Sequence, residues 1–221
     1  MRSIAFFLLA VVFAAHSQSW DSIPRLPEHY KKRTQLFAKE KASTGKILFL
    51  GNSITEGGDW KKLLGDSTVV NRGIGGDVTF GVLKRLDEVA RFKPSKVFLL
   101  IGINDLSKGI PEEVVLQNIF TIVSELKTKS PGTTVFVQSL LPVNPSFKNF
   151  PAGYALNESV IAINTQLSKI EKKFGYTYID IFKGFADKDG LMTTRFSTDG
   201  LHLNLAGYQH WVKMLKEAKY L

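Results

Sequence analysis

The sequence of 221 residues contains no cysteine. This absence excludes disulfide bonds, a thiol nucleophile and thiolate metal sites. Hydrophobic runs long enough to cross a membrane are also missing, because the longest uncharged apolar stretch, residues 4–15, is shorter than the roughly 20 apolar residues that a spanning helix needs. The fold must therefore be stabilised by its hydrophobic core, without covalent cross-links.

The first residues have the order of a secretory signal. Arg2 precedes the apolar run, and small and polar residues follow it through Ser19. We expect residues 1–19 to be a cleaved signal peptide and residues 20–221 to be the mature protein, either secreted or periplasmic. A retained anchor is the alternative, but the run is too short for one. No stable membrane insertion is expected after the signal is removed, and the lack of cysteine excludes a lipidated N-terminus.

Positive charge is in moderate excess and is dispersed along the chain. The full sequence has a net charge of +9, and loss of Arg2 with the signal leaves 28 Lys and Arg residues against 20 Asp and Glu residues, or +8. The basic clusters lack interleaved aromatic residues and no binding motif accompanies them, so we expect no nucleic-acid partner. A basic surface does attract acidic glycans.

Apolar runs rich in β-forming residues alternate with stretches of helical periodicity, the clearest of which cover residues 116–126 and 160–174. This alternation predicts an α/β fold with three layers, in which helices cover both faces of a five-stranded, mostly parallel sheet. The strand order expected for it is 2-1-3-4-5, that of the doubly wound, flavodoxin-like sheet. No repeat or linker divides the chain, so residues 20–221 are expected to form a single domain with an N-terminal helical arm. The predicted strands are residues 46–50, 67–71, 96–101, 133–140 and 176–181.

Two polar residues follow neighbouring strands of this predicted sheet. Ser53 stands just past the first strand, where it can point its hydroxyl into the crevice that binds ligands in such folds, although capping the next helix is the commoner role of such a serine. Asn104 follows the third strand and should face Ser53. Its amide can donate a hydrogen bond without a titratable charge, which suits an oxyanion hole. A turn asparagine bonded to its own backbone is the alternative.

A glycine-rich segment follows the second predicted strand. Gly73 and Gly75 invite a dinucleotide-binding interpretation, but Val78 stands where the third glycine of that motif is expected. We interpret the segment as a tight turn that presents the backbone N–H of Gly76 to a developing negative oxygen. Asp77 is expected to cap the helix that begins nearby.

The candidate base is His202, because it alone among the four histidines has a carboxylate close by in an irregular segment. Asp199, three residues earlier, can accept from Nδ1–H and leave Nε2 free to take the serine proton. Asp199 is also a good helix N-cap, and the two roles are compatible. One histidine with scattered carboxylates offers no metal ligand set, so no metal and no organic cofactor are expected. The other histidines lie in the signal, the arm and the last predicted helix: His16, His29 and His210.

Four segments together resemble the four sequence blocks of the SGNH or GDSL hydrolases, in the right order and across residues 46–221. The resemblance implies a catalytic triad of Ser53, His202 and Asp199. The oxyanion donors that it implies are the N–H groups of Ser53 and Gly76 and the side chain of Asn104. The four segments are residues 51–55, 73–77, 102–105 and 199–202.

One position departs from the family pattern, since Asn52 stands where many members carry aspartate, which keeps hydrogen bonding and removes a charge. Residues 47–57 and the compact length are most similar to the platelet-activating-factor acetylhydrolase-like branch and to exported bacterial carbohydrate acetylesterases. The resemblance therefore implies a serine esterase that removes short acyl groups, above all acetyl, from a small-molecule or polysaccharide ester. The loop of residues 142–151 is expected to form a wall of the substrate site.

Two alternatives stay open at this point. The same triad could run a lysophospholipase or thioesterase reaction on longer acyl chains. A non-catalytic glycan-binding relative that kept the fold is the alternative of another class. Nothing in the sequence points to a particular oligomeric state.

Overall fold

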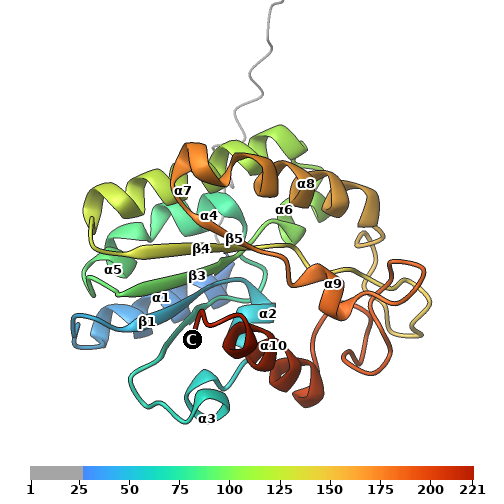
Figure 1. Ribbon diagram of the computed structural model, residues 1–221, viewed down its shortest axis with the longest axis horizontal. Helices are drawn as coiled ribbons and strands as arrows, with labels where there is room; N and C mark the ends of the chain where they lie inside the picture. Colours follow the sequence, from blue (N-terminus) through green and yellow to red (C-terminus); the bar gives the residue numbers. More distant parts are fainter. Residues whose placement is uncertain (1–26) are drawn as a thin grey trace, which may run out of the picture.

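The computed structural model describes residues 27–221, so the predicted signal peptide lies outside the described residues. The sheet is entirely parallel, with the order β2-β1-β3-β4-β5 (Figure 1). The predicted α/β class and strand order are therefore confirmed. The strands are β1 Ile47–Gly51, β2 Val70–Gly73, β3 Lys96–Leu100, β4 Thr134–Gln138 and β5 Thr177–Ile179.

Helices cover both faces of the sheet. The helices α4, α5, α7 and α8 lie on one side, and α3 and α10 lie on the other (Figure 1). The short helices α2 and α6 directly follow β1 and β3. In chain order the helices are α1 Glu28–Lys39, α2 Ser53–Glu56, α3 Trp60–Leu64, α4 Thr79–Lys84, α5 Leu86–Ala90, α6 Ile103–Ser107, α7 Glu112–Lys129, α8 Asn157–Phe174, α9 Phe182–Phe185 and α10 Leu205–Glu217.

A row of aromatic rings crosses the central strands on the side of α10. Phe49, Phe98 and Phe136 occupy the same register position on β1, β3 and β4, and their ring centroids lie 5.0 and 4.7 Å apart. Trp60 stacks on Phe49 at 3.8 Å, and Trp211 of α10 meets Trp60 edge to face at 4.9 Å. Because side chains alternate along a strand, the residues directly before and after each of these phenylalanines point to the opposite face of the sheet.

The second strand begins later than predicted. The run of residues 67–71 predicted a strand there, whereas β2 covers Val70–Gly73. Residues 67 and 68 instead lie in a turn, in which the Asp66 carboxylate accepts the backbone N–H of Thr68 over 2.7 Å. The strand consequently ends at Gly73, and the glycine-rich segment starts at the edge of the sheet.

The predicted helical arm contains α1, which packs beside the edge strand β2. The Arg72 guanidinium lies over the Phe37 ring at 4.4 Å from its centroid, and Arg91 donates to the Phe37 carbonyl over 2.7 Å. The Tyr30 hydroxyl donates to the Gly81 carbonyl of α4 over 2.7 Å. The arm is thus tied both to the sheet edge and to the helix that follows the glycine-rich segment.

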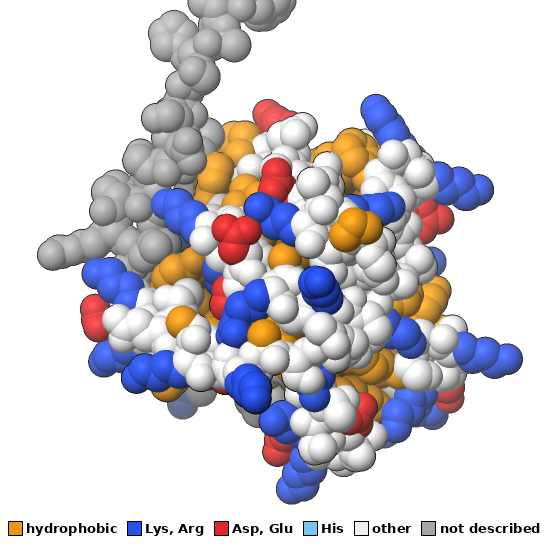
Figure 2. Space-filling view, turned by 90° about the vertical axis from the view of Figure 1, so that its left-hand side faces the viewer, with side chains coloured by type: hydrophobic (Ala, Val, Ile, Leu, Met, Phe, Trp, Pro, Cys, Tyr) orange, Lys and Arg blue, Asp and Glu red, His pale blue; other side chains and the backbone are white. Residues whose placement is uncertain are grey.

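One face of the molecule carries its positive charge in a dispersed form (Figure 2). On the face shown in Figure 2, the described Lys and Arg side chains are scattered among uncharged ones and interspersed with Asp and Glu. Of the helices within residues 27–221, none is at once long and apolar enough to span a membrane.

Candidate active site

The candidate site lies where β1 and β3 end side by side. The two strands pair in parallel, with Gly51 opposite Leu100, and the chain leaves each of them into a short helix. Ser53 is the first residue of α2, and Asn104 lies in the first turn of α6 with only 2% of its surface exposed. Both residues thus follow neighbouring strands at the same edge of the sheet.

Ser53 does not cap the helix that it begins. Asn52 has that role, because its Oδ1 accepts the backbone N–H of Ile54 over 3.0 Å. The Asn52 side chain is fully buried, and its Nδ2 has no hydrogen-bond partner among the residues that the structure describes. With the capping role taken by its neighbour, the hydroxyl of Ser53 is free, and its Oγ lies 3.0 Å from Nε2 of His202.

His202 is held in place by the carboxylate of Asp199. Nδ1 of His202 lies 2.7 Å from Oδ2 of Asp199, and Oδ1 accepts the backbone N–H groups of His202 and Leu201 over 2.7 and 2.9 Å. Partial burial raises the pKa of the Asp199 carboxyl, but the hydrogen bonds from His202 and Leu201 outweigh it and leave the pKa below its ordinary value. The carboxylate therefore stays ionised at neutral pH and favours the tautomer with a proton on Nδ1.

The segment that carries His202 is fixed by its own side chains. The Ser197 hydroxyl donates to the His202 carbonyl over 2.6 Å and accepts the Gly200 N–H over 2.8 Å. Asn204, not Asp199, is the N-cap of α10, since its Oδ1 accepts the Gly207 N–H over 2.9 Å. The Asp199 carboxylate is consequently engaged only with the segment of residues 199–202 and not with the helix.

Asn104 is hydrogen-bonded to Asp77, the residue that follows Gly76 in the glycine-rich loop. Gly76 has a φ of +75°, a backbone conformation that residues other than glycine rarely adopt. Its N–H donates to no group among residues 27–221. Nδ2 of Asn104 donates to the carbonyl of Asp77 over 2.8 Å. One amide hydrogen of Asn104 thus holds the glycine-rich loop, and the other donates to no group among residues 27–221.

Asp77 does not cap α4, contrary to the prediction. Its buried carboxylate pairs with Arg85 at 2.9 Å, and Arg85 also donates to the carbonyl of Gly51 over 3.1 Å. Burial raises the pKa of Asp77, and the Arg85 guanidinium opposes that rise. The carboxylate pairs with the arginine instead of capping the helix, because a buried charge needs a partner of opposite charge. The ion pair joins the end of β1 to the glycine-rich loop beneath the site.

At the N-terminus of α4, the hydrogen-bond acceptor is another carboxylate, that of Asp105. It accepts the Thr79 N–H over 3.0 Å and also the Thr79 hydroxyl, which in turn accepts from Asn118 over 2.9 Å. Asp105 is fully buried, and this burial raises its pKa to about 6, against the opposing effect of the hydrogen bonds from Thr79. The neighbour of Asn104 is thereby anchored to the helix that follows the glycine-rich loop.

Tyr154 was not predicted to belong to the site, yet its hydroxyl donates to Oδ1 of Asn104 over 2.7 Å. A single tyrosine in a loop of irregular structure carries no sequence signal of such a contact. The predicted wall of residues 142–151 precedes Tyr154 in the same loop, and Asn144 of that wall donates to the carbonyl of Gly200 over 2.9 Å. The loop thus contacts the segment of the base and, through Tyr154, the asparagine.

The geometry can support acyl transfer. A hydroxyl, an imidazole and a carboxylate form one continuous hydrogen-bonded chain, and amide donors lie on the glycine-rich loop and on α6. Within residues 27–221, no group of three or more His, Asp or Glu side chains is arranged to hold a metal ion.

Comparison with known proteins gives consistent matches over most of the chain. The sequence model of the GDSL-like Lipase/Acylhydrolase family matches residues 49–210. Platelet-activating factor acetylhydrolase IB subunit alpha2 of Rattus norvegicus is 32% identical over 179 residues, covering 77% of this chain and 74% of the relative. Among solved structures, a Streptococcus pneumonia protein described as a platelet activating factor is 32% identical, with a TM-score of 0.76 over 86% of this chain and 92% of its own.

A more distant structural neighbour is a mutant of an acetyl-xylooligosaccharide esterase from Geobacillus. It is 18% identical, with a TM-score of 0.63 over 80% of this chain and 94% of its own. At this level of identity the likeness concerns the fold.

Proposed function

This chain belongs to the GDSL-like lipase/acylhydrolase family, and from that membership we propose that it removes short acyl groups, above all acetyl, from carbohydrate esters through an acyl-serine intermediate. The chain is an ester-cleaving hydrolase. The observation that carries the proposed mechanism is the 3.0 Å separation between Oγ of Ser53 and Nε2 of His202, with Asp199 bonded to the other ring nitrogen.

In the first half of the proposed reaction, Nε2 of His202 takes the proton of Ser53 as Oγ attacks the ester carbonyl. The carbonyl oxygen becomes an oxyanion, and the Asp199 carboxylate stabilises the imidazolium that has formed. The tetrahedral intermediate then collapses. The bond to the alcohol oxygen breaks, and His202 returns the proton to that oxygen, so that the free sugar hydroxyl leaves.

In the second half, a water molecule gives its proton to Nε2 of His202 and attacks the acyl-serine carbonyl. The second tetrahedral intermediate expels Oγ of Ser53, which recovers the proton, and the carboxylic acid is released. Both intermediates carry their negative charge on the same oxygen. The proposed donors to it are the N–H groups of Ser53 and Gly76 and the free amide hydrogen of Asn104.

The preference for a short acyl group rests on two considerations. Several relatives of 31–32% identity are named platelet-activating factor acetylhydrolases, and a structural neighbour is named an acetyl-xylooligosaccharide esterase. The loop after β4 is also tied down, because Asn144 bonds to Gly200 and Asn157 exchanges two hydrogen bonds of 2.8 Å with Val143. A loop tied down in this way does not readily move aside to admit a long acyl chain, which supports the preference.

Hydrolysis of p-nitrophenyl acetate by the wild type and by Ser53→Ala tests the mechanism. We expect the variant to lose almost all activity, and wild-type activity in the variant would refute it. Assays on esters from two to twelve acyl carbons test the chain length. A maximum at eight carbons or beyond would favour the lysophospholipase or thioesterase alternative, and release of acetate from acetylated glycans would identify the sugar.

A glycan-binding relative without activity is the competing class. A fluorophosphonate that reacts with activated serines separates the two, because an enzyme becomes labelled at Ser53 and a binding protein does not. Loss of labelling in Ser53→Ala, with an unchanged melting temperature, is the matching control.

We also propose that the protein is exported and that residues 1–19 are removed. The charged, apolar and small-residue order at the start of the sequence supports this. Sequencing of the N-terminus of the protein recovered outside the cytoplasm tests it. An intact Met1 in that fraction would contradict cleavage.

A further inference from the structure

The N-terminal arm contacts the glycine-rich loop through a small apolar cluster. Tyr30 and Phe37 of α1 pack with Ile74, and these three buried side chains form a cluster separate from the main core. Ile74 has no exposed surface and lies two residues before Gly76. The arm therefore supplies the apolar surroundings of the loop that carries a proposed oxyanion donor.

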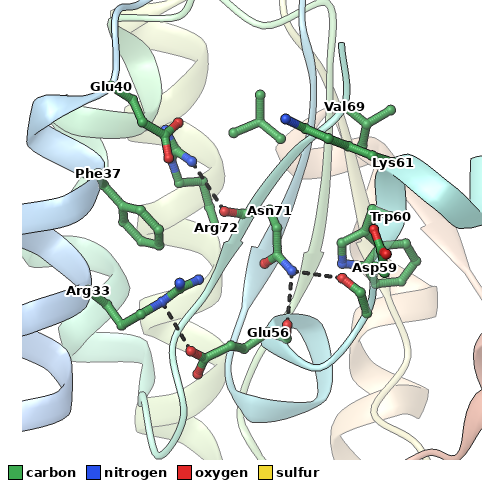
Figure 3. A pocket seen from close by; sticks show the side chains of 12 residues that line it. Arg33, Phe37, Glu40, Glu56, Asp59, Trp60, Lys61, Val69, Asn71 and Arg72 are labelled. Atoms are coloured by element: carbon green, nitrogen blue, oxygen red, sulfur yellow. Dashed lines mark hydrogen bonds and ion pairs between the residues drawn. The ribbon is translucent and has the colours of Figure 1, made fainter. Parts of the chain in front are cut away.

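A charged cluster lies beside the apolar one, and its centre is the carboxylate of Glu56. Oε2 of Glu56 accepts the backbone N–H of Gly75. From α1, His29 reaches the same carboxylate at 2.9 Å and Arg33 at 3.0 Å (Figure 3 shows Arg33 facing Glu56). Arg33 also donates to the carbonyl of Gly73 over 3.1 Å. The arm thus holds the loop both through Glu56 and directly.

Glu56 belongs to the same short helix as the nucleophile. Helix α2 begins at Ser53 and ends at Glu56, and the Glu56 carbonyl accepts from Asn71 of β2 over 3.0 Å. The loop touches this helix closely, because a side chain at Gly73 would overlap the backbone nitrogen of Glu56. One residue therefore joins the helix of the serine to the loop of the oxyanion donor.

The other contacts of the loop do not replace this one. The Ile74 N–H donates to Gly51 and the Asp77 N–H donates to Ile74, each over 3.1 Å. The carbonyl of the peptide between Ile74 and Gly75 is thus held by Asp77, and its N–H, on Gly75, is held by Glu56. An oxyanion hole works only when its donors lie within about 2.7–3.1 Å of the charged oxygen, and a displacement of about 1 Å costs roughly 100-fold in rate.

We infer that α1 is a working part of the active site, in which Glu56, held by His29 and Arg33, is a positioning residue that fixes the Gly75 peptide and so aims the N–H of Gly76. The inference rests on the proposed function. It goes beyond the triad and the donors, because none of these three side chains touches the reacting atoms.

The test compares Glu56→Ala, Glu56→Gln and Arg33→Gln with the wild type on p-nitrophenyl acetate. We expect kcat to fall by roughly 10- to 100-fold in Glu56→Ala, with KM within twofold, because the loop is displaced while substrate contacts persist. Glu56→Gln keeps an acceptor for Gly75 and should lose less. The exposed Glu158 of α8, replaced by Ala, is the matched control and should leave kcat unchanged.

Two further measurements distinguish positioning from general damage. Glu56 and Arg33 line a pocket between α1 and β2 (Figure 3), outside the main core, so the melting temperature of Glu56→Gln should stay close to that of the wild type. The pH at which kcat is half-maximal should also be unchanged, because the base is untouched. A kcat of Glu56→Ala within twofold of the wild type, or a rise in KM alone, would overturn the inference. A wild type that neither hydrolyses esters nor reacts with fluorophosphonate would instead refute the proposed function.

Discussion

The hydroxyl of Tyr154 and the side-chain carbonyl of Asn104 form a hydrogen bond of 2.7 Å, and on its other side the Asn104 amide donates to Asp77 over 2.8 Å. The Asp77 carbonyl fixes which way round the amide lies, because a flip would set two acceptors, the side-chain oxygen of Asn104 and the Asp77 carbonyl oxygen, against each other. The second amide hydrogen of Asn104 is thereby directed away from both partners, as a donor to a substrate oxygen must be.

Tyr154→Phe should lower kcat by about tenfold, since loss of one hydrogen bond to a buried group is worth ~1–1.5 kcal/mol. Steady-state kinetics on p-nitrophenyl acetate measures this. The same change in an Asn104→Ala background should have almost no effect, because the partner is already absent. An equal loss in both backgrounds would show that Tyr154 acts by another route.

Asn104→Ala should lower kcat by roughly 10²–10³, the usual cost of removing one oxyanion donor. KM should change little, because the bond strengthens only as the charge develops. Single-turnover measurements of acyl-enzyme formation would locate the loss in the chemical step. A variant that loses affinity for substrate while keeping its acylation rate would contradict this role.

Asp199→Asn should lower kcat by roughly 10³–10⁴, as a wrong histidine tautomer does in other serine hydrolases. The amide NH₂ would donate to Nδ1 of His202, so the ring proton would move to Nε2, which could no longer accept the serine proton. Circular dichroism should show an unchanged fold, since the side-chain oxygen can still accept from Leu201 and His202. Turnover within tenfold of the wild type would argue against Asp199 as the orienting group.

Asp105→Asn should change how stability depends on pH. The pKa of Asp105 rises from its ordinary 3.8 to about 6 on folding, so the folded protein binds this proton more tightly than the unfolded chain does. Wild-type stability should therefore fall as pH rises from about 4 to about 6, by up to ~3 kcal/mol relative to the asparagine variant. Urea unfolding at pH 4 and pH 7 measures the difference between the two proteins. If the difference in unfolding free energy is the same at both pH values, titration of Asp105 does not cause the pH dependence of stability.

The strands of the sheet could be predicted because each contains a short apolar run. The alternation of strands and helices along the chain then allows few topologies. The start of β2 was predicted too early because Val69 continues the apolar pattern before Val70. The turn that Asp66 stabilises keeps residues 67 and 68 out of the strand. The role of Asp77 was also wrong, since only the folded chain brings the Arg85 guanidinium to its carboxylate.

Which residues could carry the chemistry follows from local patterns, because the α/β topology brings a serine after one strand, an asparagine after its neighbour and an Asp-x-x-His segment to one edge. How those groups are aimed depends instead on contacts between segments far apart in the chain. Tyr154 and Glu56 reach Asn104 and Gly75 across gaps of 50 and 19 residues, and no local pattern encodes such contacts. They exist because the packing of a loop and an N-terminal helix places one hydroxyl and one carboxylate within hydrogen-bonding distance of the loops that surround the serine.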